Sequence, residues 1–312
     1  MQTILAVPIR NSTPMNPQRL PVFTLSEWEY KLLHSSIANQ VCTDGRWRGG
    51  QSVASPSDIV ITEQRRREIQ ARVNVGRSVA ADVFCFGIGE PELPYCTKVG
   101  GIPFRPSNSP WPVDSDGGPM TFVAQLCFCE SEDLFSGLPG DVLLFFASDY
   151  DICPSDRKRK THFEWQNLNA GQLLTPDAVP NTQWRVPALY GCRYRTADYP
   201  DEAAVNAARS YCHGGWGSWW NIFCWEGTKI GGVPMWIQNS EIPSEVEFPG
   251  RFLAAIGTCT PTCDIEFPWI NQQAPMTFKE SQSSNFLEWD DSGMIYLSLD
   301  SNNEVHWTLQ YY

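Results

Sequence analysis

Thr97-Lys98-Val99-Gly100-Gly101-Ile102-Pro103 recurs 131 residues later as Thr228-Lys229-Ile230-Gly231-Gly232-Val233-Pro234. The two copies differ only by exchanges between valine and isoleucine. Their spacing is too long for a solenoid repeat and is close to the length of one domain. In each copy a strand ends at the β-branched residue, the glycine pair permits a turn with positive φ, and the proline fixes the exit direction. The repeat therefore predicts two related β units.

The correspondence continues after each copy of the phrase. Residues 120–126 form an apolar run that contains Phe, and residues 138–146 lead through a glycine into a second apolar run. Residues 251–256 and 291–299 repeat this order in the second part of the chain. Three elements in the same order predict an internal duplication. We expect one domain over 83–312, made of two halves at about 83–200 and 213–312.

The pattern from Val83 onward is that of strands, since short apolar runs alternate with Gly, Pro, Asn and Asp. It predicts a mainly β fold with some helix (a β-rich α+β class), in which two β units pack into one roll-like body. The segment Asp300-Ser301-Asn302-Asn303 favours the turn of a final hairpin. The candidate strands are 83–86, 122–128, 142–146, 184–189, 191–195, 221–225, 235–237, 252–256, 294–299 and 305–311.

Residues 1–82 are expected to form a helical, loop-rich extension. Ser26-Glu27-Trp28-Glu29 matches a capping box, and a helical stripe follows it to about Asn39. A second helix is predicted from about Thr62. A further helix is expected at 200–212, because Pro200 suits a first helical position and Gly214-Gly215 would end it.

Composition limits the class of protein. Of the 312 residues, 42% are hydrophobic and 13 are Trp, so a large core is expected. No stretch approaches the roughly 18 apolar residues that cross a bilayer. The 11 cysteines are scattered, many in apolar runs, and none forms a CxxC pair. These features predict a soluble, cytoplasmic protein without a structural metal.

The charge is acidic and unevenly distributed. The chain carries a formal charge of −12, and residues 241–312 contribute −9, because eleven acidic residues oppose Arg251 and Lys279. A surface of this sign repels nucleic acid and anionic membranes and attracts basic partners. The same charge also serves solubility without any partner. Both interpretations stay open at this point.

Catalytic chemistry has little support in the sequence. The Gly-Gly turns lack a P-loop or dinucleotide-binding pattern, and none of the four His lies near a nucleophile motif. Lys98 and Lys229 could either face one cleft or pin one strand each. Asp290 and Asp291 could bind a cation or act as acid and base, or they could simply form a turn. The sequence predicts no cofactor and no set of catalytic residues.

A Gly/Trp cluster at 213–220 is the most unusual local sequence. Trp216, Trp219 and Trp220 fall within five positions that also hold Gly217 and Ser218. They could form a flat platform for a sugar or a peptide, or they could pack in the core, which is where Trp is less costly to place.

The chain resembles the YwqG-like family of bacterial proteins, a family of unknown function. The resemblance rests on Lys98 to Pro103 with Trp111-Pro112, on Phe122 to Leu126, and on Lys229 to Pro234 with Ile237-Gln238. It spans about residues 83–310 and implies a mainly β, roll-like fold without an assigned activity. Some members are associated with bacterial toxin–immunity gene neighbourhoods. Ala255 stands where the first half has Gln125, which argues against a symmetric pair of glutamines.

Together these features predict a non-catalytic binding protein, in one version an immunity-type protein that binds a basic, toxin-like partner through its acidic C-terminal surface. The alternatives are a hydrolase-like enzyme with a cleft between the halves, and a small-ligand or carbohydrate binder that uses the Gly/Trp cluster. The candidate binding residues are Lys98, Trp111, Gln125, Trp216, Trp219, Lys229, Gln238, Asp290 and Asp291.

Overall fold

A computed structural model describes residues 77–148, 160–182, 184–199, 224, 227–238, 243–244, 248–258, 287, 289 and 293–311. The predicted N-terminal extension, the helix at 200–212 and the strand at 221–225 lie almost wholly outside these residues. Within them the protein is mainly β, as the sequence predicts. The strands are β1 (Val79–Ile88), β2 (Lys98–Val99), β3 (Thr121–Cys127), β4 (Val142–Ala147), β5 (Thr161–Gln166), β6 (Leu189–Asp198), β7 (Lys229–Gly231), β8 (Arg251–Gly257), β9 (Met294–Leu299) and β10 (Val305–Gln310).

All ten strands join in one antiparallel order, β10-β9-β8-β7-β1-β6-β2-β3-β4-β5. The order is symmetric about the long β1–β6 pair. Along the chain β1 precedes β2–β5 and β6 precedes β7–β10, so we call β1–β5 the first unit and β6–β10 the second unit. In the sheet, however, β1 pairs with β7 and β6 pairs with β2. The two units have therefore exchanged their long strands.

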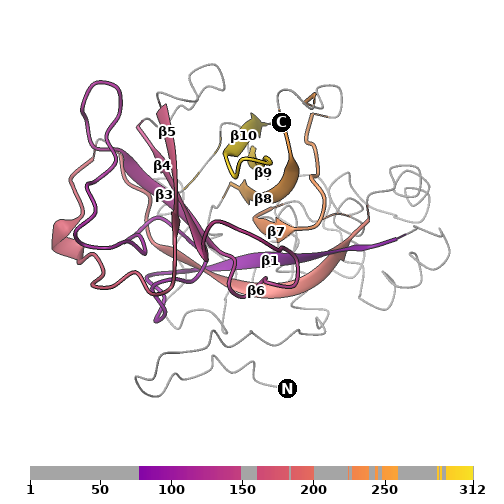
Figure 1. Cartoon of the computed structure of the whole chain (residues 1–312), viewed down its shortest axis with the longest axis horizontal. Helices are drawn as coiled ribbons and strands as arrows, with labels where there is room; N and C mark the ends of the chain where they lie inside the picture. The colour runs from indigo at the N-terminus through magenta and orange to yellow at the C-terminus, as the bar shows by residue number, and fades with distance from the viewer. Residues whose placement is uncertain are drawn as a thin grey trace, which may run out of the picture.

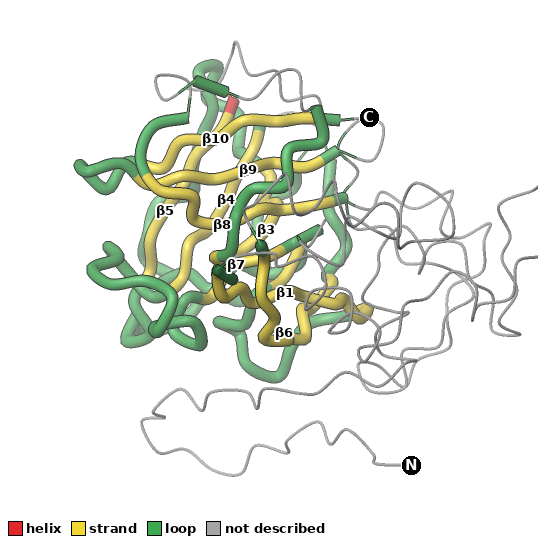
Figure 2. The backbone as a smooth tube through the Cα atoms, turned by 90° about the vertical axis from the view of Figure 1, so that its right-hand side faces the viewer, coloured by secondary structure: helices red, strands yellow, loops and turns green. Residues whose placement is uncertain are grey.

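The sheet bends into two layers that face each other. Figure 1 shows β3–β5 and β8–β10 rising from the long β1–β6 pair, and Figure 2 shows the same layers from the side. The core between them includes Val123 and Phe145 from one layer and Ile256 and Ile295 from the other. At the open edges of the sheet, Nε1 of Trp307 on β10 donates to Oγ1 of Thr161 on β5 at 3.1 Å.

The central strands read as continuous apolar runs because both of their faces are covered. On β4, Leu143 and Phe145 face the core between the layers, whereas Leu144 and Phe146 pack in a second cluster on the outer side. The alternation follows from the two-residue period of a strand. In β9, all six residues are buried in the same way.

The two units share a matching irregularity. The pairing of β3 with β4 shifts between Phe122 and Ala124, and the pairing of β8 with β9 shifts between Phe252 and Ala254. Each bulge inserts one extra residue, which bends the strand and increases its twist. The extra residues, Val123 and Leu253, are fully buried.

Several boundaries differ from the sequence-based expectation. Met235–Ile237 is not a strand, because this segment instead lies over the outer face of β9, where the Tyr296 hydroxyl donates to the Met235 carbonyl. Residues 184–188 are not part of a strand, although the Val186 and Ala188 carbonyls accept the N–H groups of Gly101 and Gly89, and only Leu189 of that expected strand belongs to β6. The hairpin of β9 and β10 confirms the predicted turn at 300–303. In the described part of the chain no helix is long and apolar enough to span a membrane.

Candidate binding site

The first Gly-Gly turn is held by an ion pair. Lys98 Nζ lies 2.6 Å from Glu90 Oε2 and also donates to the Ile102 carbonyl, while the Ile102 N–H donates to Glu90 Oε1 at 2.7 Å. Gly100 and Gly101 both have φ near +70°, at +64° and +74°. A side chain at Gly101 would collide with the Glu90 carboxylate. The glycines therefore permit both the left-handed turn and the close approach of the carboxylate.

The second turn repeats this device. Lys229 Nζ lies 2.6 Å from Asp198 Oδ2, which also accepts the Val233 N–H at 3.1 Å. A side chain at Gly232 would again collide with the carboxylate. Lys229 also donates to Cys224 Sγ at 3.3 Å. Glu90 and Asp198 each stand at the end of a long strand of their own unit, so the two ion pairs are equivalent by position.

The two pairs differ in burial. Lys229 and Asp198 are 0% and 1% exposed, whereas Lys98 is 1% exposed and Glu90 is 37% exposed. Burial lowers the pKa of Lys98, and Glu90 only partly opposes that effect. For Lys229, burial also acts to lower the pKa, but the combined effects of Asp198 and Cys224 outweigh it and raise the pKa. Of the two roles left open by the sequence, the contacts support the one in which each lysine pins its own turn.

Gln125 stands opposite Lys98 in the β2–β3 pair and is completely buried. Its Oε1 accepts the Phe104 N–H at 2.9 Å, and its Nε2 donates to the carbonyls of Pro94 and Cys96 at 2.8 and 2.7 Å. The amide therefore joins the segments on either side of β2. In the second unit Ala255 faces Lys229 at the equivalent position. Alanine has no amide, so it cannot form the hydrogen bonds that Gln125 forms in the first unit.

A cavity of about 590 Å³ opens beside the first Gly-Gly turn. One wall is the turn itself, with the start of β3 and Trp111. The other is the segment between β5 and β6, which begins with the short 3₁₀ helix η2 (Pro176–Ala178). A volume of this size is typical of a small-molecule site. Its lining is Gly101, Ile102, Trp111, Thr121, Phe122, Pro176, Val179, Pro180, Thr182, Arg185, Val186 and Pro187.

Trp111 is fixed in this wall. Its Nε1 donates to the Met120 carbonyl at 2.8 Å, and its ring packs edge-on against Phe146 with the centroids 5.4 Å apart. The guanidinium of Arg105 lies 6.0 Å from the centre of the ring. The indole therefore presents a preformed apolar surface, because its polar group is already bonded inside the protein.

The loop between β3 and β4 packs against the second Gly-Gly turn and the start of β8. The side chain of Leu134 lies against Gly231. Arg251, which takes the place of Thr121 at the start of the strand, donates from Nη2 to the Ser136 carbonyl at 3.0 Å and lies 5.2 Å from the ring centre of Phe135. The first Gly-Gly turn thus borders the cavity, whereas the described part of the second Gly-Gly turn is in contact with Leu134.

Of the other sequence-predicted residues, the four that the structure describes (Lys98, Gln125, Lys229 and Gln238) do not line this cavity. Gln238 is half-buried, and its backbone N–H donates to Gln310 Oε1 at 3.1 Å, next to β10. Trp216, Trp219, Asp290 and Asp291 lie outside the described residues. Their proposed roles stay predictions.

A buried polar network, which the sequence analysis missed, crosses β1, β6 and the loop after β3. The Asp82 carboxylate accepts from Arg195 Nε at 2.6 Å, from Arg193 Nη1 at 3.1 Å and from Ser131 Oγ at 2.6 Å. Arg195 also binds Asp133. The signal in the sequence was the alternation of Arg193 and Arg195 with uncharged residues, which places both on one face of β6. These contacts bind the first unit to the strand β6 of the second.

Glu130 borders this network. Its carboxylate lies 3.9 Å from Arg193 Nε and is largely buried. Burial raises the pKa of Glu130 to about 7, with Arg193 opposing the rise and Asp82 adding to it. Perturbed carboxyl groups often occur at functional sites, but structural networks perturb them too. Glu130 does not line the cavity, so we assign it to the network.

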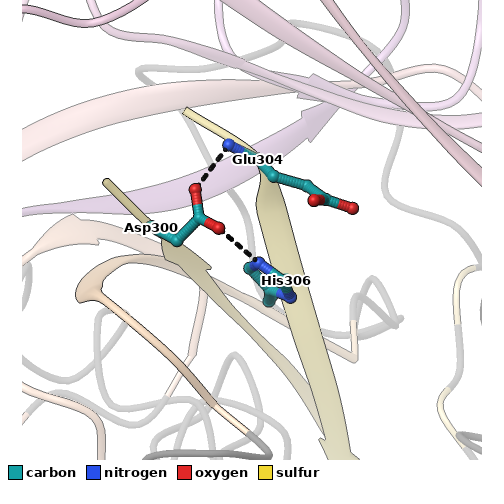
Figure 3. Close-up of side chains that lie close together, drawn as sticks. All are labelled: Asp300, Glu304 and His306. Atoms are coloured by element: carbon teal, nitrogen blue, oxygen red, sulfur yellow. Dashed lines mark hydrogen bonds and ion pairs between the residues drawn. The ribbon is translucent and has the colours of Figure 1, made fainter. Parts of the chain in front are cut away.

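One group of side chains has the composition of a metal site. Asp300, Glu304 and His306 lie together on the β9–β10 hairpin (Figure 3). The Asp300 carboxylate accepts the N–H groups of Asn302 and Glu304 at 2.8 and 2.9 Å and contacts His306 Nε2 at 3.2 Å. These hydrogen bonds close the turn, and Asp favours such turns for this reason. The turn explains the cluster without a metal.

The buried thiols are core residues. Cys127 Sγ and Cys129 Sγ are 2.8 Å apart, and burial raises the pKa of Cys127 well above its ordinary value. Burial also raises the pKa of Cys224 to about 12, against the opposing effect of Lys229. Thiols of this kind are poor nucleophiles.

Comparison with known proteins places a domain of unknown function (DUF1963) at residues 97–186. No curated protein matches the chain. The matched segment begins at the first phrase and ends one residue before Pro187. It therefore includes every residue that lines the cavity except that proline, which makes the DUF1963 domain of this chain the part that carries the candidate site.

Proposed function

We propose that this chain is a non-catalytic binding protein whose ligand occupies the cavity beside the first Gly-Gly turn. The observation that carries the proposal is the cavity itself, of about 590 Å³ and lined by Trp111, Phe122 and three prolines. Pockets of this volume with mainly apolar walls are the usual form of small-molecule sites.

The lining favours binding over catalysis. None of the residues that line the cavity is a His, Cys, Asp or Glu. The two hydroxyl groups, of Thr121 and Thr182, both donate to the Trp184 carbonyl. A general base and an activated nucleophile within hydrogen-bonding reach of each other would be the signature of a hydrolase, and the cavity walls offer neither.

A matched pair of variants tests this proposal. Val179→Trp places an indole in the cavity, whereas Val113→Trp adds the same side chain at a residue that is 57% exposed and does not line it. A compound library would be screened by thermal shift, and hits would be measured by calorimetry. Hits should bind the wild type and Val113→Trp alike and should lose affinity for Val179→Trp. Hits that bind all three proteins equally would place the ligand elsewhere.

We also infer that the chain is a YwqG-like protein of bacterial type and that its two units arose by duplication. The DUF1963 match at 97–186 and the phrase at 97–103 support the first inference. The symmetric strand order, the two bulges and the two lysine–carboxylate pairs support the second. Among the described cysteines, the buried Cys127, Cys129 and Cys224 form no disulfide, which supports a cytoplasmic location.

A basic protein partner is the second candidate. The charge of −9 over residues 241–312 favours it. Neutralising Glu288, Asp290 and Asp291 should weaken binding of a lysine-rich peptide at low salt, as measured by fluorescence anisotropy. The control removes the same charge from three exposed residues of the first unit, Asp116, Glu132 and Asp177. Equal weakening by both triple variants would show a general charge effect and would remove the acidic C-terminal surface as a specific site.

A further inference from the structure

We propose that the cavity selects an aromatic carboxylate, with the ring against Trp111 and Phe122 and the carboxylate on Arg185. This inference rests on the proposed function, because it names the chemical class of the ligand that would occupy the same cavity. It depends on which groups of the cavity wall can still bond to a ligand.

The apolar part of the wall suits a flat ring. Trp111 and Phe122 come from one side, and Pro176, Val179 and Pro180 come from the other. Trp111 is held by its bond to Met120 and its edge-on contact with Phe146. Phe122 also packs on Phe146, at 5.5 Å between centroids. Aromatic rings contribute a large buried area and prefer such edge-on or offset neighbours, so a ring bound here would meet preorganised partners.

Both hydroxyl groups, the indole N–H and two backbone N–H groups of the wall are already bonded inside the protein. The Thr121 and Thr182 hydroxyls donate to the Trp184 carbonyl at 2.9 and 2.6 Å. The Ile102 N–H donates to Glu90 at 2.7 Å, and the Gly101 N–H donates to the Val186 carbonyl at 3.3 Å. A sugar needs several donors and acceptors that converge on its hydroxyls. The donors of the wall named above are already bonded within the protein, so they do not favour a sugar. The hypothesis that Trp216 and Trp219 bind a carbohydrate is separate, because it concerns the Gly/Trp cluster at 213–220.

Arg185 is the exception. It is the one charged residue among those that line the cavity, and it lies at the solvent-exposed side. Its Nη2 donates to Asn181 Oδ1 at 3.0 Å, and a guanidinium carries further N–H donors in a planar fork that matches a carboxylate. No carboxylate stands among the lining residues to neutralise it. The local charge therefore favours an anionic group, although the protein as a whole carries −12.

The experiment compares two ligands of nearly equal shape, naphthaleneacetate and naphthaleneacetamide, by calorimetry. The wild type should bind the acid about tenfold more tightly than the amide, a factor that corresponds to ~1.4 kcal/mol and is reasonable for a hydrogen bond to a charged group. In Arg185→Gln this preference should fall to about one, and Arg185→Lys should restore part of it. Arg77→Gln, which neutralises another exposed arginine outside the cavity, should keep the wild-type preference.

The possible outcomes separate this inference from the proposed function. Equal binding of acid and amide, lost in Val179→Trp, would refute selection by Arg185 and leave the cavity as a binding site. Failure of both compounds to bind, while other library compounds bind and lose affinity in Val179→Trp, would refute the aromatic carboxylate class alone. If no compound distinguishes Val179→Trp from Val113→Trp, the proposed function fails as well. Arg185 is exposed, and thermal unfolding of each variant would verify that its fold is unchanged.

Discussion

Replacement of Lys229 by methionine should destabilise the protein much more than the same replacement of Lys98. Both lysines occupy the same position in the repeated phrase, and both are buried. Their partners differ, because Asp198 is 1% exposed and Glu90 is 37% exposed. Methionine keeps most of the length and volume of the lysine chain, so the comparison isolates the charge.

The magnitude follows from the partner that is left behind. Removal of one member of a buried ion pair strands the other and costs about 3–5 kcal/mol. In Lys229→Met, the Asp198 carboxylate would lose the cation that balances its charge, while it still accepts the Val233 N–H at 3.1 Å and stays buried away from water. In Lys98→Met, the Glu90 carboxylate can turn to solvent, and the loss should be of order 1–2 kcal/mol, close to that of a single hydrogen bond to a charged group.

The assay is urea unfolding followed by far-UV circular dichroism, with the free energy taken from midpoints at a constant slope. The double variant Lys229→Met/Asp198→Asn is the internal control. The asparagine oxygen can still accept the Val233 N–H, and residues 198 and 229 no longer carry a charge. The double variant should therefore be more stable than Lys229→Met alone. Equal losses for Lys98→Met and Lys229→Met, or no recovery in the double variant, would refute the assignment of the cost to the stranded Asp198.

Two further predictions concern stability. Burial raises the pKa of Glu130 from 4.5 to about 7. Between these two values the folded state keeps a proton that the unfolded state releases. The free energy of unfolding should therefore fall by about 3 kcal/mol at most between pH 5 and pH 8. In Glu130→Gln, the urea midpoints at pH 5 and pH 8 should differ less than they do in the wild type. An unchanged difference would contradict the protonation we infer. Gly232→Ala would press a methyl group against Asp198 at φ +73°, whereas Gly117→Ala at φ +83° meets open space. The Gly117 variant should lose about 1–2 kcal/mol from backbone strain alone, the Gly232 variant should lose clearly more, and similar thermal midpoints would argue against a close carboxylate.

Much of the sheet could be predicted from the sequence because its central strands are buried on both faces and read as apolar runs. The run Val142–Phe146 and the hairpin at 294–310 are examples. Strand β5 (Thr161–Gln166) was not predicted, since as an edge strand it mixes His and Glu with aromatic residues. Met235–Ile237 was predicted as a strand from its apolar character, but that character serves packing over β9.

The site was harder to predict because its determinants are not local. The phrase marked Lys98 and Lys229, but their carboxylates lie 8 and 31 residues away. The residues that line the cavity come from separate segments between Gly101 and Pro187. Of these residues, only Trp111 was predicted from the sequence as a candidate binding residue. Arg185 had no motif around it. Arg185 becomes a candidate ligand-binding residue only in the structure, because the hydroxyls of Thr121 and Thr182 are already bonded within the protein.

The exchange of β1 and β6 between the units has a consequence for biosynthesis. Strand β1 is synthesised first, but both of its neighbours, β6 and β7, are synthesised only after the whole β2–β5 meander. During translation the two edges of β1 and one edge of β2 therefore lack their final partners, and unpaired strand edges promote wrong association. A nascent chain that ends before β6 cannot complete its sheet, so β6 and β7 must leave the ribosome before the strands of the first unit have all their partners.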